Sequence, residues 1–129
     1  MPAKPVRPTE AELEILTVLW SRGPATVREV YETLRRKRKS AQYATVLKFM
    51  QIMAQKGLLE RDETDRAHVY APVHSRELIH QQLAGDLLQR GFDWSMKNLL
   101  IGALSARKAT KEELAELRKL LDDYEKGKR

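Results

Sequence analysis

Residues 43–73 decide the fold, and their sequence is YATVLKFMQIMAQKGLLERDETDRAHVYAPV. In the first half, apolar side chains recur every three or four residues, which is the spacing of one face of a helix. That helix is expected to end at Gly57, because glycine readily takes the left-handed conformation that closes helices. The second half reads as two strands, 58–62 and 67–73, around the polar tip 63–66. The stretch therefore predicts a helix followed by a β-hairpin. The inward face of the helix is predicted to consist of Val46, Phe49, Met50 and Met53.

Two further helices are expected before this stretch, and each has its own start signal. Thr9 with Glu12, and Thr26 with Glu29, have the spacing of a capping box, in which a hydroxyl and a carboxylate bond each other's free backbone amides. The pair Gly23-Pro24 separates the two helices, because proline cannot continue a helix. Three helices followed by a hairpin are the order of elements in a winged helix-turn-helix domain.

The sequence after residue 73 is helical in pattern, with leucine stripes in three segments. The segments are separated by breaks at Gly91 and before Thr110, which forms a third capping-box pair with Glu113. The last segment has apolar residues at steps of three, four and three, the spacing of a coiled-coil seam. A thin helical extension cannot bury such stripes by itself, so they predict a homodimer. The predicted dimer contacts are Leu83, Leu87, Leu99, Leu100, Leu114, Leu117, Leu121 and Tyr124.

The chain is therefore expected to be mainly α, with three parts. Residues 1–8 contain three prolines and are expected to form a flexible basic tail. Residues 9–73 are expected to form a winged helix DNA-binding domain, and residues 74–129 a helical dimerisation domain. No apolar run approaches the ~18 residues of a membrane span, and the opening lacks the hydrophobic segment of a signal peptide. We expect a cytoplasmic protein.

Positive charge is concentrated in one part of the chain. The 129 residues include 24 Lys and Arg against 18 Asp and Glu, and residues 28–48 alone hold seven basic residues against two acidic ones. Such a stretch favours DNA phosphates, because each neutralised phosphate releases counterions whatever the base sequence. The alternative is an ordinary solvated helix end. The predicted phosphate contacts are Arg28, Arg35, Arg36, Lys37, Arg38 and Lys39, with Arg66 at the hairpin tip.

Base readout is expected from the outward face of the helix that begins near residue 43. Gln pairs with adenine, Lys pairs with guanine, and the methyl groups of Thr and Ala contact the methyl group of thymine. For Tyr43, a packing role is the alternative to a base contact. The predicted base-reading residues are Gln42, Tyr43, Ala44, Thr45 and Lys48.

Patterns typical of enzymes and cofactor sites are missing from the sequence. It has no Cys, which excludes disulfides, thiolate metal sites and a cysteine nucleophile. It also has no phosphate-binding glycine loop, nucleophile elbow or HExxH helix, so we expect neither catalysis nor a cofactor. His74, Glu77 and His80 are spaced by three, which leaves a metal- or ligand-sensing regulator open as an alternative. A module whose basic run binds an acidic protein is a further alternative.

Four segments occur in a specific order: PTEAELEILTVLW at 8–20, GPATVREVYETL at 23–34, YATVLKFMQIMAQKGLLER at 43–61 and DRAHVYAPV at 65–73. With these segments the chain resembles, over roughly residues 8 to 122, the penicillinase repressor family, the BlaI and MecI type of bacterial transcriptional repressors. The resemblance implies a winged helix that reads a dyad operator and a C-terminal dimerisation arm. It also implies a membrane sensor-protease system that cuts the arm to relieve repression.

The C-terminal part departs from some relatives in this family. The copper-responsive branch carries a cysteine cluster there, which this chain lacks. The Asn-Phe cleavage pair of the penicillinase repressors, counted back from the segment 110–117, falls on Gly102 and Ala103. By resemblance, these two residues mark the cleavage position.

Overall fold

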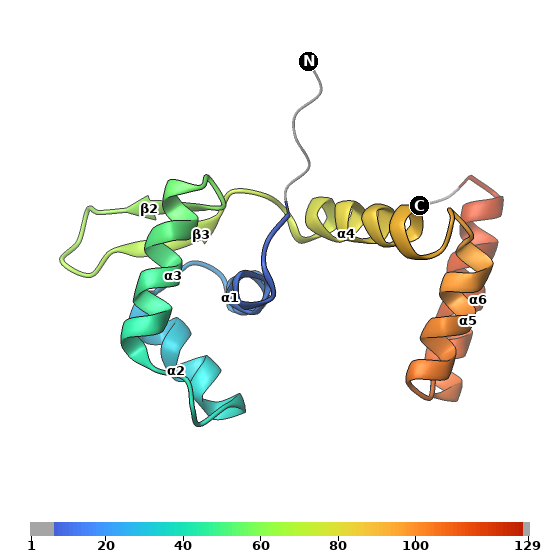
Figure 1. Cartoon of the computed structure of the whole chain (residues 1–129), viewed down its shortest axis with the longest axis horizontal. Helices are drawn as coiled ribbons and strands as arrows, with labels where there is room; N and C mark the ends of the chain where they lie inside the picture. Colours follow the sequence, from blue (N-terminus) through green and yellow to red (C-terminus); the bar gives the residue numbers. More distant parts are fainter. Residues whose placement is uncertain (1–6, 128–129) are drawn as a thin grey trace, which may run out of the picture. The chain divides into compact units, whose positions relative to one another are not determined.

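The computed structural model describes residues 7–127, which form six helices and one three-stranded sheet (Figure 1). The chain divides into two compact units, one running to Ala84 and the other beginning at Gly85. The prediction of a mainly α fold, with three helices and a hairpin followed by helices, is confirmed. Residues 1–6 of the predicted basic tail lie outside the described residues. The elements are α1 (Glu10–Arg22), β1 (Ala25–Thr26), α2 (Val27–Lys37), α3 (Tyr43–Gln55), β2 (Leu59–Asp62), β3 (Val69–Pro72), α4 (Arg76–Gly91), α5 (Met96–Ala106) and α6 (Lys111–Glu125).

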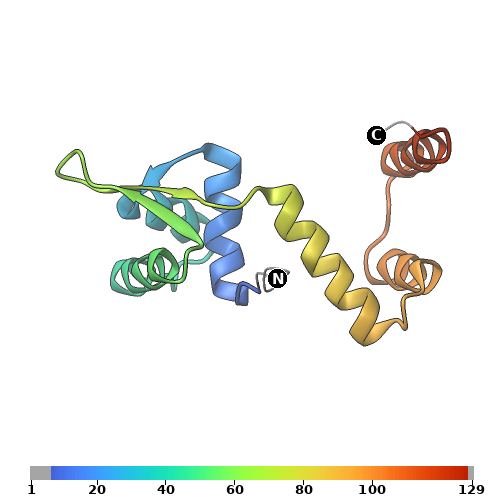
Figure 2. The same ribbon diagram turned by 90° about the horizontal axis from the view of Figure 1, so that it is seen from above.

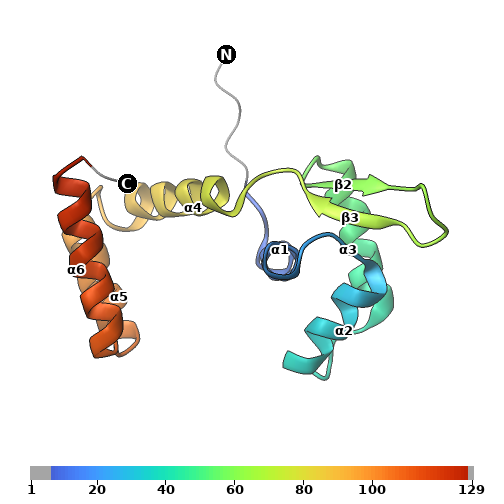
Figure 3. The same ribbon diagram turned by 180° about the vertical axis from the view of Figure 1, so that it is seen from behind.

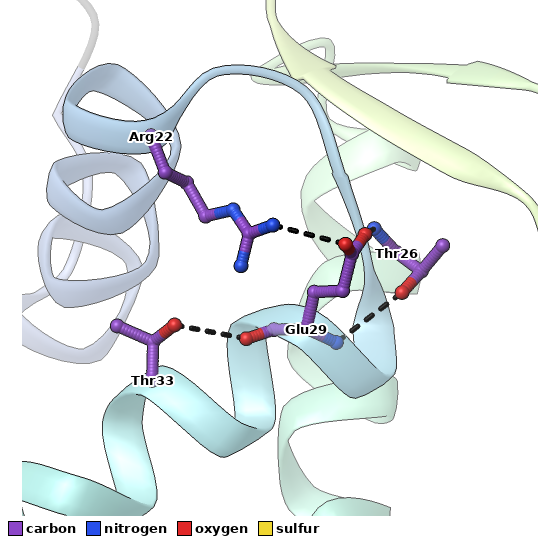
Figure 4. A network of polar contacts seen from close by, with 4 residues as sticks. All are labelled: Arg22, Thr26, Glu29 and Thr33. Carbon is purple, nitrogen blue, oxygen red and sulfur yellow. Dashed lines mark hydrogen bonds and ion pairs between the residues drawn. The ribbon is translucent and has the colours of Figure 1, made fainter.

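Both capping boxes predicted for α1 and α2 are present. At the start of α2, the Thr26 hydroxyl accepts from the Glu29 amide at 3.2 Å, and the Thr26 amide donates to the Glu29 carboxylate at 2.9 Å. Figure 4 shows that the same carboxylate also accepts from Arg22 of α1, at 2.9 Å, while Thr33 donates to the Glu29 carbonyl at 3.0 Å. Glu29 therefore connects the end of α1 to the start of α2.

The hairpin strands β2 and β3 pair antiparallel, and β3 is the central strand of the sheet. The third strand, β1, was not predicted from the sequence. It has two residues, Ala25 and Thr26, which pair antiparallel with Tyr70 and Val69 of β3. A strand this short has no periodicity of its own, and only its distant partner defines it. It fixes the connection between α1 and α2 to the hairpin.

Helices α1 to α3 and the sheet enclose one hydrophobic core. The predicted inward face of α3 is confirmed, because Val46, Met50 and Met53 are buried and Phe49 packs partly buried against them. Gly57 has a φ of 83°, the left-handed conformation expected at the end of this helix. The other buried members of the core include Ile15, Leu16, Leu19, Val30, Leu34, Leu58 and Tyr70.

One carboxylate also lies inside this unit. The side chain of Glu12 is 3% exposed, and its two oxygens lie 2.9 and 3.1 Å from the Lys56 ammonium. Burial acts to raise the pKa of Glu12, but the amide of Thr9 and the ammonium of Lys56 outweigh burial and hold this pKa below its ordinary value. The ion pair connects the start of α1 to the end of α3.

We expect Glu12→Gln to lower the free energy of unfolding by about 1–2 kcal/mol at neutral pH. The folded-state pKa of Glu12 is depressed, so its carboxylate stabilises the fold above the pKa of an unfolded glutamate. That contribution disappears as the pH falls through the folded-state pKa. Urea unfolding at about pH 7, 5 and 3 measures both effects, with Glu10→Gln as the control for an exposed acid in the same turn. A pH dependence equal to that of wild type would contradict the assignment.

The first turns of α4 pack on the winged-helix unit. Ile79 is completely buried, and the indole nitrogen of Trp20 donates to the His74 carbonyl at 3.2 Å. The rings of Trp20 and His80 meet edge to face, with centroids 5.8 Å apart. The change from one compact unit to the other lies within α4, at residues 84 and 85. The domain boundary expected at residues 73 and 74 stays a prediction.

In the second unit, α4 ends at Gly91, where the sequence predicts a break. Asp93 and Trp94 follow with left-handed φ values of 48° and 65°, and α5 begins at Met96. One local prediction needs correction. Before α6, only half of the predicted capping box forms. Thr110 accepts from the amide of Glu113, but the Glu113 carboxylate pairs with Arg107 at 2.7 Å.

Helices α5 and α6 have no buried residue along their lengths. Figure 2 shows them nearly end-on and apart from each other, joined by a connecting segment, and Figure 3 shows the same helices from behind. Their leucines are therefore half-buried or exposed in the single chain. Among the described helices, none is both long and apolar enough to cross a membrane.

Candidate nucleic-acid interface

The first turns of α3 present a continuous exposed surface. All five residues predicted to read bases are exposed, and Ala44 and Lys48 point away from the buried face of the helix, whereas Tyr43 lies beside that face. Gln42 is the N-cap residue, and Lys48 lies about one turn beyond Thr45. These residues thus lie together at the start of α3, while their contact with bases stays a prediction. The residues are Gln42, Tyr43, Ala44, Thr45 and Lys48.

A basic cluster, defined here as Arg35, Arg36, Lys37 and Lys39, occupies the end of α2 and the connection to α3. All four side chains are exposed, and within residues 7–127 none of them forms an ion pair. Arg38 differs, because its guanidinium lies 2.8 Å from the Glu14 carboxylate of α1. The basic cluster is therefore available to phosphates, whereas Arg38 would have to leave an existing partner.

Near Arg66, at the hairpin tip, the carboxylates of Asp62 and Glu63 each have a partner of their own. The Asp62 carboxylate accepts hydrogen bonds from the Thr64 hydroxyl and, at 2.9 Å, from the Thr64 amide. Both hydrogen bonds lower the pKa of Asp62. Glu63 pairs with Arg61 at 3.0 Å. Arg66 is exposed and forms no ion pair with any residue of the described range. The ion pair with Arg61 partly neutralises Glu63, whereas Asp62 keeps its negative charge, because a lowered pKa favours the carboxylate.

Tyr43 combines packing with exposure. The Arg28 guanidinium carbon lies 4.9 Å from the centre of the Tyr43 ring, and Tyr31 meets that ring edge to face at 5.7 Å. Tyr43 nevertheless keeps 37% of its surface exposed. Tyr31 is not among the predicted site residues, although Arg28 and Tyr31 have the spacing of three that places two residues on one helix face.

A groove of about 470 Å³ lies beside Tyr43, between the start of α2, α3 and the hairpin. Gln51 and His68 line it and were not among the predicted site residues. Gln51 follows Lys48 by three residues on α3, a spacing that identifies it as a neighbour on the same face. His68 lies close to β3, 3.9 Å from the Glu63 carboxylate. Several hydrogen-bonding side chains therefore surround the groove: Arg28, Tyr43, Gln51, Arg66, His68 and Tyr70.

The structure gives no support to the metal-sensing alternative. Among residues 7–127, no group of three or more His, Asp or Glu is arranged to hold a metal ion. Of the three residues with suggestive spacing, His80 packs its ring against Trp20, and His74 contributes its carbonyl to the same indole. Glu77 is exposed on the first turn of α4.

The residues predicted for dimerisation and cleavage lie on exposed or half-exposed helix surfaces. Leu83, Leu99, Leu114 and Leu117 are half-buried. Leu87, Leu100, Leu121 and Tyr124 are exposed. The cleavage position, Gly102 and Ala103, is exposed and lies in the interior of α5.

The chain is similar in sequence to known transcriptional regulators. The sequence profile described as penicillinase repressor matches residues 8–123. Transcriptional regulator BlaI of Mycobacterium tuberculosis is 36% identical over 126 residues, covering 97% of this chain and 90% of that protein. The penicillinase repressor of Bacillus licheniformis is 22% identical, covering 94% of each chain.

A similar solved structure is that of a MarR family protein from Bacillus stearothermophilus. Its TM-score is 0.54 at 15% identity, covering 96% of this chain and 76% of that one. The likeness concerns the fold, which is the winged helix-turn-helix. Together with the profile match and the similarity to BlaI, this shows that the chain belongs to the penicillinase repressor family of transcriptional regulators.

Proposed function

We propose that the chain is a repressor that binds a two-fold symmetric DNA operator as a homodimer, with α3 of each protomer in the major groove. The observation that carries this proposal is the exposed start of α3 beside the basic cluster, which forms no ion pair within residues 7–127. Side chains of α3 would read base edges, while the basic cluster and Arg66 would hold the phosphates on either side. Family membership supports the repressor function.

The homodimer is supported by the second unit. Helices α5 and α6 bury no side chain, and exposed apolar groups remain along both, including Ile101 and Leu104 on α5 and Leu120 on α6. Contiguous exposed apolar side chains are typical of protein–protein interfaces. Pairing with a second copy by two-fold symmetry would bury these side chains on both chains at once. The dimer would place two α3 helices on half-sites about one DNA turn, ~10 base pairs, or a multiple of this apart.

Release from DNA is proposed to follow loss of the C-terminal arm. A chain cut in α5 would keep the winged-helix unit and lose α6, so each half-site would be bound alone. The bond between Gly102 and Ala103 lies inside a regular helix, whereas proteases prefer exposed loop tips. Cleavage there would require α5 to open locally first. This step rests on the family resemblance.

We expect Lys48→Ala and Thr45→Val to change which base pairs the protein prefers. Lys48→Ala removes an ammonium group, and Thr45→Val removes a hydroxyl that can bond a base edge while keeping the methyl that can contact thymine. One base contact contributes about 1–3 kcal/mol of discrimination, roughly 5- to 150-fold. Fluorescence anisotropy on an operator and on variants with single base-pair changes measures this.

The matched control for these variants is Gln55→Ala, an exposed residue at the opposite end of α3. It is expected to leave base preference unchanged. If Lys48→Ala and Thr45→Val weakened every DNA sequence by the same factor, α3 would not be the reading element.

A further inference from the structure

Three side chains form what we call the Tyr43 stack: Arg28 and Tyr31 of α2, and Tyr43 of α3. The Arg28 guanidinium carbon is 4.9 Å from the centre of the Tyr43 ring, within the ~6 Å range of a cation–π interaction. The Tyr31 ring meets the Tyr43 ring at 83° with centroids 5.7 Å apart, the favoured edge-to-face geometry of aromatic pairs. Tyr43 is thus contacted by two side chains of another helix while part of its ring stays exposed.

The position of this stack matters because α3 begins without a side-chain cap. Gln42, its N-cap residue, makes no capping hydrogen bond, whereas α1 and α2 both begin with complete capping boxes. Helix ends without caps fray, because their first amides have no intrahelical partner. The first turn of α3 contains Tyr43, Ala44 and Thr45, the residues that the proposed function assigns to base readout. The Tyr43 stack connects this turn to α2, whose own start is held by Thr26 and Glu29.

We propose that Arg28 is a positioning residue for sequence readout: it holds Tyr43, and with it the first turn of α3, in one orientation. The inference rests on the proposed function and assigns Arg28 a role other than the phosphate contact suggested by its charge. The guanidinium is already placed over the ring in the DNA-free chain. Phosphates next to the stack can be met instead by Arg66, which also lines the groove beside Tyr43.

The two roles for Arg28 predict different binding data. A phosphate contact contributes equally to all DNA, and its loss lowers the slope of log affinity against log salt by about 0.9. A positioning residue contributes to the ratio of operator affinity to scrambled-DNA affinity. For Arg28→Ala we expect this ratio to fall by roughly 3- to 10-fold, the scale of one cation–π contact coupled to a base contact. The salt slope measured on scrambled DNA should stay close to that of wild type.

Three further variants separate charge from stacking: Arg28→Lys, Tyr43→Ala, and Arg28→Ala combined with Tyr43→Ala. Arg28→Lys keeps the charge but loses the planar guanidinium, so it should retain the affinity for scrambled DNA and still lose discrimination. In a Tyr43→Ala background, Arg28→Ala should cause no additional loss of discrimination, because the ring that the Arg28 guanidinium contacts is absent. Circular dichroism of each variant checks that the helices remain folded.

The experiment measures full-length wild type and the four variants by fluorescence anisotropy on the operator and on scrambled DNA, over a salt series. The inference is supported if Arg28→Ala and Arg28→Lys each lower the affinity ratio when Tyr43 is present, and Arg28→Ala causes no further loss in the Tyr43→Ala background. It is overturned if Arg28→Lys behaves as wild type, or if Arg28→Ala weakens both DNAs equally and lowers the salt slope. A wild-type chain with no preference for any operator would overturn the proposed function itself, and the inference with it.

Discussion

The variant Leu121→Arg is expected to be a monomer that binds the operator about 10²- to 10⁴-fold more weakly than the wild-type chain. Leu121 is 62% exposed on α6, a helix in which no residue is buried. A charge placed there would be desolvated without a partner at the proposed dimer interface, which is strongly unfavourable. Because the side chain is exposed in the single chain, the substitution should leave the fold of the protomer intact.

Light scattering at micromolar concentration gives the oligomeric state, and anisotropy gives the affinity for a full operator and for a half-site. Half-site affinity should be unchanged in Leu121→Arg. The control is Ala115→Arg, which adds the same charge at an exposed position about 120° around the axis of α6 from Leu121. A monomeric wild type, or a dimeric Leu121→Arg with full operator affinity, would show that the second unit does not set dimerisation.

Replacing the four residues of the basic cluster with alanine is expected to weaken binding to every DNA sequence by about 10²- to 10³-fold at low salt. These side chains are exposed and form no ion pair within residues 7–127, so each is free to neutralise a phosphate. The slope of log affinity against log salt should fall by about 3 to 4, since each phosphate contributes about 0.9. The ratio of operator to scrambled-DNA affinity should remain near the wild-type value.

Arg38→Ala is the matched comparison within the same run of charges. Its guanidinium pairs with Glu14 at 2.8 Å, so its removal should change the salt slope less than removal of Arg36. Binding measured between about 50 and 200 mM salt provides both slopes. If the basic-cluster variant kept the affinity and salt slope of wild type for scrambled DNA, the electrostatic assignment would be wrong.

Features of the fold that depend on neighbours in the sequence could be predicted. The capping boxes at Thr9 and Thr26 join residues three apart, and Gly57 closes α3 by its own conformational freedom. Features that depend on distant partners could not. Strand β1 exists because it pairs with β3, and the Glu12 carboxylate is stabilised by Lys56, 44 residues away.

The same distinction applies to the candidate site. The exposed face of α3 followed from the periodicity of its buried face, since one face of a helix determines the other. The partners of individual charges did not follow, because Arg28 and Arg38 lie in one basic stretch and yet contact a tyrosine ring and a glutamate. Charge patterns predict where cations gather, while only the packing of α1, α2 and α3 shows which of them are already engaged.

The central claim is that this chain reads a DNA sequence. The most direct measurement is the affinity of the full-length wild-type protein for the DNA upstream of its own gene, compared with a scrambled DNA of equal length and composition at about 150 mM salt. A specific repressor binds its site at least about 10³-fold more tightly than other DNA. We predict a ratio of that size. Equal affinity for the upstream and scrambled DNA would contradict the account and would favour a basic module that binds an acidic protein.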